Sequence, residues 1–288
     1  MHDNTAESVE NALRSPEKVV CRPFLKWVGG KSQLLPELGK RAPKKFRRYY
    51  EPFVGAGAFL FNLQPKQAFI LDVNNDLINA YNVVKTDVES LIEDLRQHFY
   101  EKDYFYKIRD VDRLDDYKKW SPIARASRLI FLNKTCFNGL YRVNSKGQFN
   151  TPFGRYTNPT ILDGDNLRAC SKALQNVSIQ IADFRDFESN ATNEDFVYFD
   201  PPYVPLSTTA YFTSYSERGF DSKMQIELFE LCKRLDKKNI KFMLSNSSAT
   251  YVLELYKDFK IEIVAANRAI NSNGTRRGPV NEVIVTNY

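Results

Sequence analysis

A carboxylate, two rigid prolines and an aromatic ring follow the apolar run at 196–199. They are Asp200, Pro201, Pro202 and Tyr203. This set suits methylation of a planar exocyclic amine, whose lone pair is delocalised into the ring and is therefore a poor nucleophile. The Asp200 carboxylate and the Pro201 carbonyl can accept both amine hydrogens, which favours a pyramidal nitrogen, while Tyr203 stacks on the base. The alternative interpretation is a turn that only ends a strand.

A glycine turn at 51–57, with the sequence EPFVGAG, is a second candidate site. It follows a strand-like run, so Gly55 and Gly57 allow close approach of a ligand. The dinucleotide fingerprint requires a third glycine where Leu60 stands, which weakens an NAD site but leaves open an adenosine site without a pyrophosphate. Asp72 ends the next strand-like run, where it can accept from ribose hydroxyls. A glycine turn with a helix-capping aspartate and no ligand explains these residues equally well.

The GGKS sequence at 29–32 resembles the end of a phosphate-binding P-loop. That motif requires an earlier glycine where Leu25 stands, so a P-loop is excluded. A flexible turn that presents Trp27, Lys26 and Lys31 beside a ligand is one alternative. A Trp27 that simply packs in the core is the other.

Short β-rich runs alternate with helical patterns along most of the chain, which predicts an α/β domain with a mostly parallel sheet. The runs lie at 49–54, 69–73, 177–183, 196–200, 240–246, 260–266 and 282–288. The last two are compatible with an antiparallel hairpin at the sheet edge. Before it, a helix is predicted with Asp221 as its cap, because apolar residues recur at helical spacing from Met224 to Leu235.

The segment 77–165 breaks this alternation, because its patterns are helical and basic. We expect it to be an inserted, mainly helical second domain. The catalytic domain then consists of 21–76 and 166–288. Residues 1–20 are polar and lack a sustained period, which predicts a frayed N-terminal extension.

Local signals place elements within the insertion. Thr86 with Glu89 predicts a capping box, and Ser121 followed by a proline predicts the start of another helix. Residues 138–154, called the hairpin below, read as two short strands around a turn at 144–147.

Composition narrows the classes of protein. The chain has 288 residues, 43% hydrophobic and 26% charged, with no apolar run near the roughly 20 residues that span a bilayer. Four cysteines without paired spacing favour reduced thiols in a cytoplasm. The 41 basic residues outnumber the 35 acidic ones, and basic clusters at 26–48 and 125–172 indicate either a polyanionic partner or two solvated faces. Candidate phosphate contacts are Lys40, Arg41, Lys44, Lys45, Arg47 and Arg48.

Several short motifs in one order resemble the Dam-type DNA adenine-N6 methyltransferases, and among them the GATC-modifying enzymes of the DpnII kind. The motifs are FLKWVGGK (24–31), EPFVGAG (51–57), LDVN (71–74), FNGLYR (137–142), FNTPFG (149–154), DPPY (200–203) and LSNSS (244–248). The resemblance implies a Rossmann-like, S-adenosylmethionine-dependent methyltransferase fold, S-adenosylhomocysteine as product and no metal. It also implies double-stranded DNA as substrate, 77–165 as the domain that recognises the target DNA, and base flipping. The implied protein is cytoplasmic and nucleoid-associated, from a bacterium or phage.

The resemblance further implies roles for particular residues. The donor-site positions are Trp27, Lys31, Phe53, Gly55, Gly57, Asp72, Asp183, Phe184 and Asp200. The positions that face DNA are Lys26, Asn138, Leu140, Arg142 and Pro152. Catalysis falls to Asp200, Pro201, Pro202 and Tyr203. Thr151 departs from the family, where valine is common beside the base-reading proline.

Other functions share part of this pattern. Aminomethyltransferases acting on cytosine N4, ribosomal RNA or a protein glutamine carry the same acidic-prolyl-prolyl-aromatic motif, but the insertion with Arg142 favours duplex DNA. A cytosine-C5 enzyme is disfavoured, because none of the four cysteines follows a proline. A DNA-binding regulator without catalysis would bind GATC DNA but transfer no label from the donor. Whether a cognate restriction endonuclease is encoded alongside the chain is left open.

Overall fold

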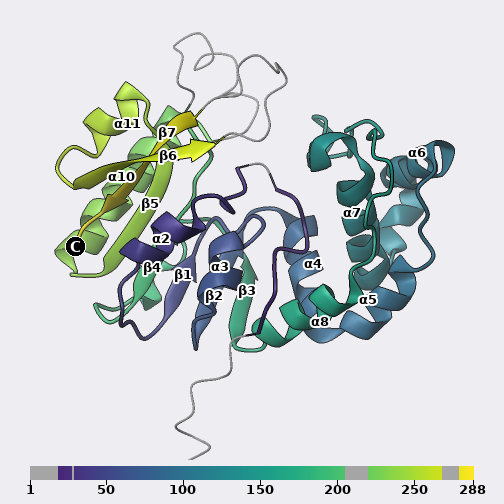
Figure 1. Ribbon diagram of the computed structural model, residues 1–288, viewed down its shortest axis with the longest axis horizontal. Helices are drawn as coiled ribbons and strands as arrows, with labels where there is room; N and C mark the ends of the chain where they lie inside the picture. Colours follow the sequence, from purple (N-terminus) through teal and green to yellow (C-terminus); the bar gives the residue numbers. More distant parts are fainter. Residues whose placement is uncertain (1–18, 28, 205–219, 268–278) are drawn as a thin grey trace, which may run out of the picture.

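A seven-stranded sheet with helices on both faces forms one part of the molecule, and a group of helices lies beside it (Figure 1). The computed structural model describes residues 19–27, 29–204, 220–267 and 279–288. The strand order is β3-β2-β1-β4-β5-β7-β6, in which β3 to β5 run parallel and β7 is antiparallel to both of its neighbours. The strands are β1 (Tyr49–Glu51), β2 (Ala68–Asp72), β3 (Val177–Ile181), β4 (Phe196–Phe199), β5 (Lys241–Ser247), β6 (Lys260–Asn267) and β7 (Pro279–Thr286).

The strand order reverses between β1 and β4, which are hydrogen-bonded neighbours. From β1 the chain proceeds outward to β2 and β3, and then returns to β4 on the other side. In open α/β sheets, ligands bind outside the carboxyl ends of the strands at such a reversal. The glycine turn after β1 and Asp200 after β4 therefore meet where a ligand site is expected.

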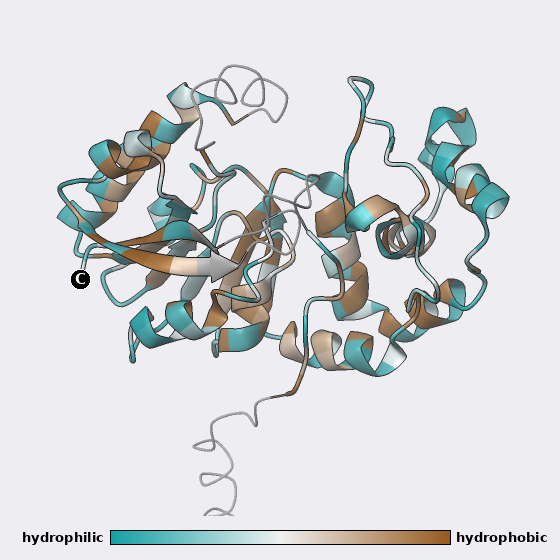
Figure 2. Cartoon of the chain, turned by 45° about the horizontal axis from the view of Figure 1, so that its top comes forward, coloured by the Kyte–Doolittle hydropathy of each residue, from teal (hydrophilic) through white to brown (hydrophobic). Residues whose placement is uncertain are grey.

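Alternate residues of the strands point into two cores, one on each face of the sheet. Tyr49 and Tyr198 belong to the first core, whereas Tyr50 and Phe199 belong to the second. The helices packed on the first core are α2 (Leu35–Arg41), α3 (Ala58–Leu63), α4 (Asn75–Thr86), α5 (Val88–Leu95), α7 (Pro122–Thr135) and α8 (Gly164–Ala173). Those on the second are α10 (Ser222–Lys237) and α11 (Thr250–Leu255). Figure 2 shows apolar residues on the inner faces of these elements and polar residues outside.

The predicted insertion is mainly helical and has a small core of its own. Besides α4, α5 and α7, it contains α6 (Lys102–Asp110), η1 (Val111–Arg113), η2 (Asp115–Lys119) and η3 (Phe137–Gly139). Phe105, Phe131 and Phe149 are central to that core. Helix α4 crosses the predicted boundary at residue 77 and packs against both the sheet and α7. That this part recognises DNA stays a prediction.

Several local predictions are confirmed. The Ser121 hydroxyl accepts a hydrogen bond from the backbone N–H of Ala124 at 3.1 Å, which caps α7, and Asp221 accepts from Met224 at 2.9 Å, which caps α10. In the hairpin, Val143 and Phe149 form an antiparallel bridge. The final two strands pair antiparallel at the edge of the sheet, as expected.

The predicted capping box at Thr86 is wrong. Thr86 is the last residue of α4, and its hydroxyl donates to the carbonyl of Asn82 rather than capping α5. Glu89 instead binds Arg168, with its Oε1 2.6 Å from Nε. The strand predicted at 49–54 also ends early, at Glu51, because the next residue is a proline without a backbone N–H.

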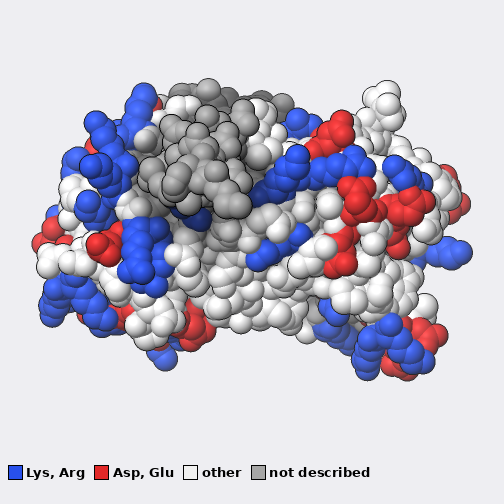
Figure 3. Space-filling view, turned by 90° about the horizontal axis from the view of Figure 1, so that it is seen from below, with Lys and Arg blue, Asp and Glu red and all other residues white. Residues whose placement is uncertain are grey.

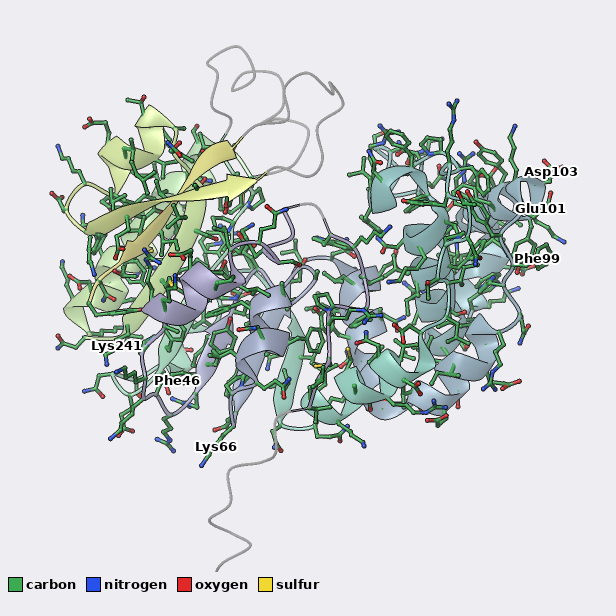
Figure 4. The ribbon with its side chains drawn as sticks, viewed as in Figure 1. Phe46, Lys66, Phe99, Glu101, Asp103 and Lys241 are labelled. Atoms are coloured by element: carbon green, nitrogen blue, oxygen red, sulfur yellow. The ribbon has the colours of Figure 1, made fainter. Side chains whose placement is uncertain are left out.

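The basic residues at 40–48 lie away from the reversal point. Figure 4 labels Phe46, Lys66 and Lys241, which lie just before or at the start of β1, β2 and β5, at the lower edge of the sheet. This is the amino end of the strands. Arg48 pairs with the buried Asp195 at 2.7 Å, and seen from below the basic side chains form several separate groups with acidic ones among them (Figure 3). We therefore assign this cluster no role in the site.

The predicted N-terminal extension falls almost entirely outside the described residues. In the part of the chain that the structure describes, no helix is both long and apolar enough to cross a membrane.

Candidate active site

Asp200 lies just beyond the fully buried strand β4 and is held by two partners. Its Oδ1 accepts a hydrogen bond from the Ser245 hydroxyl at 2.9 Å and pairs with the Lys31 ammonium at 2.8 Å. The Ser245 hydroxyl is also hydrogen-bonded to that of Tyr198, at 2.9 Å. Both of these contacts are made through Oδ1. The side chain is thus fixed, and its carboxylate keeps lone pairs for a donor from a ligand.

Asp200 and its partner Lys31 are largely shielded from solvent. Its side chain is 20% exposed and that of Lys31 is 6% exposed. Burial raises the pKa of Asp200, whereas the Lys31 ammonium lowers it. Hydrogen bonds to a carboxylate are stronger in such a site than in bulk water. Lys31 also donates to the carbonyl of Gly29, which orients the ammonium.

The residues after Asp200 are held against neighbouring elements. The Tyr203 hydroxyl donates to Oε2 of Glu282 in β7 at 2.7 Å, and the Lys31 ammonium lies 4.4 Å from the centre of the Tyr203 ring. Pro201 is buried and Pro202 exposed, and the Pro202 carbonyl accepts from a side-chain amide of α10. The loop therefore presents a ring and a carboxylate in a fixed arrangement at the carboxyl end of the sheet.

The glycine turn and Asp72 are joined directly. Gly55 and Gly57 have φ values of 47° and 64°, and a Cβ atom on Gly57 would lie 2.5 Å from the Tyr81 hydroxyl oxygen, so glycine is required there. Asp72 Oδ2 accepts from the N–H of Gly55 at 3.3 Å, and Oδ1 accepts from that of Asn74 at 2.9 Å. Burial raises the pKa of Asp72, and these backbone donors lower it. Since each oxygen accepts one hydrogen bond from the backbone, lone pairs are left for hydroxyl donors.

Aromatic rings from two strand ends meet beside this turn. The Phe53 ring stacks on that of Phe184, with centroids 5.3 Å apart, and Phe220 contacts Phe53 edge-on. The Phe184 ring is only 2% exposed, so these neighbours cover it. Asp183 pairs with Arg185 at 2.6 Å. A contact of Asp183 or Phe184 with the donor stays a prediction.

The residues predicted to face DNA come together on and beside the hairpin. They are Lys26, Asn138, Leu140, Arg142 and Pro152. The Lys26 side chain lies over Gly139, where a Cβ atom would be 2.5 Å from its Cδ. Arg142 is exposed, and its Nε donates to Oδ1 of Asn150 at 2.7 Å. The buried Thr151 hydroxyl donates to the Leu140 carbonyl at 2.7 Å, so this departure from the family lies under the hairpin.

Comparison with known proteins identifies the family. The family of D12 class N6 adenine-specific DNA methyltransferases matches residues 27–270. The chain belongs to this family. Its mixed seven-stranded sheet fits the S-adenosylmethionine-dependent methyltransferase fold. The protein is therefore an adenine-specific DNA methyltransferase, and membership of the family implies S-adenosylmethionine as its methyl donor.

Relatives of this D12 class methyltransferase match it over nearly the whole chain. A type II methyltransferase of Lactococcus lactis subsp. cremoris is 46% identical, over 96% of this chain and 99% of its own length. A type II methyltransferase of Methanocaldococcus jannaschii is 45% identical, over 93% and 99%. The DNA adenine methylase of Escherichia coli K12 is 35% identical, over 91% and 94%.

Sequence reasoning gave no role to several residues that the structure of this D12 class methyltransferase brings into the site. Ser245 and Asn246 end an apolar strand-like run in the sequence, and both are buried in the structure. Polar residues at the end of such a run are a sequence signal that could have pointed to the site. Asn246 accepts from the backbone N–H of Val204 at 3.1 Å and so holds the loop after Asp200. Glu282 had no such signal, because only strand pairing brings it to Tyr203.

Glu51 is another buried group beside this site. Its side chain is 2% exposed and accepts a hydrogen bond from the Tyr49 hydroxyl at 2.8 Å. Burial raises the pKa of Glu51 to about 8, against the lowering effect of the Tyr49 bond, and the charge of Asp200 raises it further. Glu51 therefore keeps its proton to a higher pH than an exposed glutamate does.

Glu51→Gln is expected to remove a pH dependence of stability. An ordinary glutamate titrates near 4.5, so between there and about 8 the folded state holds a proton that the unfolded state has lost. The free energy of unfolding of the wild type then falls as pH rises through this range, by at most about 1.4 kcal/mol per pH unit. Denaturant unfolding at pH 5 and pH 8.5 measures it. The exposed Glu254→Gln serves as control, and an unchanged slope in Glu51→Gln would contradict the assignment.

Proposed function

We propose that this enzyme methylates N6 of adenine at GATC in duplex DNA after flipping the base into the site. The observation that carries the proposal is the Asp200 carboxylate, which Ser245 and Lys31 fix through Oδ1. A buried, oriented acceptor at the strand reversal is what transfer to a poorly nucleophilic amine requires.

Asp200 and its neighbours would act on the amine. Oδ2 of Asp200 and the carbonyl of Pro201 accept the two amine hydrogens, which directs the nitrogen lone pair away from the ring. Tyr203 stacks on the flipped adenine, held in position by Glu282 at 2.7 Å. These contacts favour the transition state over the planar ground state, and this is how they raise the rate.

The donor is proposed to lie against the glycine turn. When bound, S-adenosylmethionine supplies an electrophilic methyl group. Asp72 suits its ribose, because each carboxylate oxygen is oriented by one backbone N–H and keeps a lone pair for a hydroxyl. Asp183 and Phe184 are proposed to be on the adenine side. Trp27, Lys31, Phe53 and the two glycines are proposed to complete the walls.

The GATC specificity is proposed from the hairpin. Its motifs resemble those of GATC-modifying enzymes, and Lys26, Asn138, Leu140, Arg142 and Pro152 lie on or beside it. Thr151 does not alter the surface that would meet DNA, because its side chain is fully buried and bonded to the Leu140 carbonyl. The exposed guanidinium of Arg142 suits a guanine, whose O6 and N7 accept two donors in the major groove.

Arg142→Ala is expected to relax preference at one guanine of GATC. A bidentate arginine contact contributes about 1 to 3 kcal/mol of discrimination, so methylation of the site substituted at that guanine should approach that of GATC. Rates on GATC and on its singly substituted sites measure this. Lys146→Ala, an exposed basic residue of the same hairpin, is the control. A uniform loss of activity with an unchanged preference profile would show that Arg142 does not read a base.

We further propose that methylation by this chain protects GATC sites against a restriction endonuclease, as the modification half of a restriction-modification pair does. Two of its relatives bear the name type II methyltransferase. DNA from cells that express the chain should resist a nuclease that cuts only unmethylated GATC, and DNA from cells that express Asp200→Ala should be cut. Cutting of both DNAs would contradict the proposed specificity.

A further inference from the structure

Tyr141 connects the hairpin with the donor site. Along the chain it stands between Leu140 and Arg142, two residues proposed to face the bases. Its ring stacks on the Trp27 indole, with centroids 5.1 Å apart and 22° between the planes. Within the hairpin, the Tyr141 ring also contacts the Phe149 ring edge-on, with centroids 5.8 Å apart. The ring therefore packs against both the hairpin and the catalytic domain.

Trp27 in turn covers the glycine turn. A Cβ atom on Gly55 would lie 3.0 Å from Cδ1 of Trp27, so the indole is in van der Waals contact with this glycine. The Trp27 carbonyl accepts from the N–H of Gly30 at 3.1 Å, which anchors the indole at the turn that leads to Lys31. The indole that Tyr141 stacks on is thus a wall of the proposed donor site.

A second contact joins Tyr141 to the other side of the donor site. Its hydroxyl donates to Oδ2 of Asp76 at 3.4 Å, and Arg125 holds Oδ1 of Asp76 at 2.9 Å. Asp76 lies in the first turn of α4, whose cap residue Asn74 donates its N–H to Asp72. Displacement of the Tyr141 ring would therefore disturb both Trp27 and the start of α4 beside Asp72.

We propose that Tyr141 is a positioning residue that couples donor binding to DNA recognition. The inference rests on the proposed function, which places the donor beside Trp27 and the bases beside Arg142. A donor that holds Trp27 against the glycine turn also restricts the Tyr141 ring stacked on it, and with that ring the hairpin. Bound DNA restricts the hairpin and, through Tyr141, restricts Trp27. Such coupling is reciprocal, so cognate DNA raises donor affinity by the factor by which the donor raises DNA affinity.

The test is the affinity for S-adenosylhomocysteine, a probe that does not react, measured by calorimetry with and without a saturating GATC duplex. The ratio of the two Kd values is expected to be about threefold to tenfold in the wild type, the contribution of an aromatic pair. Tyr141→Phe keeps the ring and most of this ratio, whereas Tyr141→Ala lowers it below about twofold. The control is Phe99→Ala, which removes a ring stacked on Tyr104 at 4.0 Å on the far side of the helices (Figure 4).

A ratio near one in the wild type, or a wild-type ratio in Tyr141→Ala, would overturn the inference. Tyr141→Leu keeps apolar volume without a ring and carries the same test if Tyr141→Ala fails to fold, as read from its Tm.

Failure of the proposed function would give a different result in a methylation assay. The wild type would then not methylate GATC DNA, whereas failure of this inference leaves wild-type methylation and its sequence preference intact.

Discussion

Asp200→Ala is expected to lower the rate of methyl transfer by on the order of a thousandfold. The substitution removes the oxygen proposed to accept from the amine. It also leaves the ammonium of Lys31, 2.8 Å from Oδ1 in the wild type, without its carboxylate partner. Single-turnover transfer of label to a GATC duplex at saturating donor measures the chemical step. Transfer within about tenfold of the wild type would remove Asp200 from the proposed mechanism.

Asp195→Ala is a matched control for this variant. Asp195 is also buried and paired with a cation, Arg48, at 2.7 Å, but it precedes β4 and so lies at the other end of that strand from Asp200. Asp195→Ala should lower Tm while the turnover of folded enzyme stays near the wild-type value.

A pH profile also separates the effect of the Asp200 charge on turnover from effects on folding. Because burial raises the pKa of Asp200, acid should remove the accepting carboxylate, and with it turnover, at a higher pH than for an exposed aspartate.

Asp72→Ala should weaken donor binding by roughly ten to a hundredfold, since a hydrogen bond to a charged group contributes about 1.5 to 3 kcal/mol. The carboxylate that is lost is already oriented by Gly55 and Asn74. Calorimetric titration with S-adenosylhomocysteine measures the change, and binding of DNA without donor should stay unaltered. Asp87→Ala, an exposed aspartate just past the other end of α4, is the control. Unchanged affinity in Asp72→Ala would exclude it from the donor site.

Features that depend on neighbours in sequence were predictable. The apolar runs at 69–73 and 196–200 correctly indicated strands that end at Asp72 and just before Asp200. Asp221 correctly indicated the start of α10, because a cap acts within three residues of itself. The parallel sheet and the helical insertion followed from the alternation of patterns.

Features that depend on contacts between residues distant in sequence were not predictable. Glu282 meets Tyr203 across 79 residues of sequence, and Ser245 meets Asp200 across 45, and only the order of strands brings these pairs together. The charges at 40–48 suggested contact with phosphate, but charge counted along the sequence does not say which end of a sheet it occupies. The structure places them at the amino end, with Arg48 bound to Asp195.

The central claim is transfer of a methyl group to N6 of adenine within GATC. The direct measurement is incubation of the wild-type enzyme with methyl-labelled S-adenosylmethionine and either a GATC duplex or the same duplex with the site scrambled, followed by digestion to nucleosides and chromatography. We expect label in N6-methyldeoxyadenosine from the GATC duplex and almost none from the scrambled one. Label in a cytosine derivative, or equal label in the adenine of both duplexes, would contradict the account.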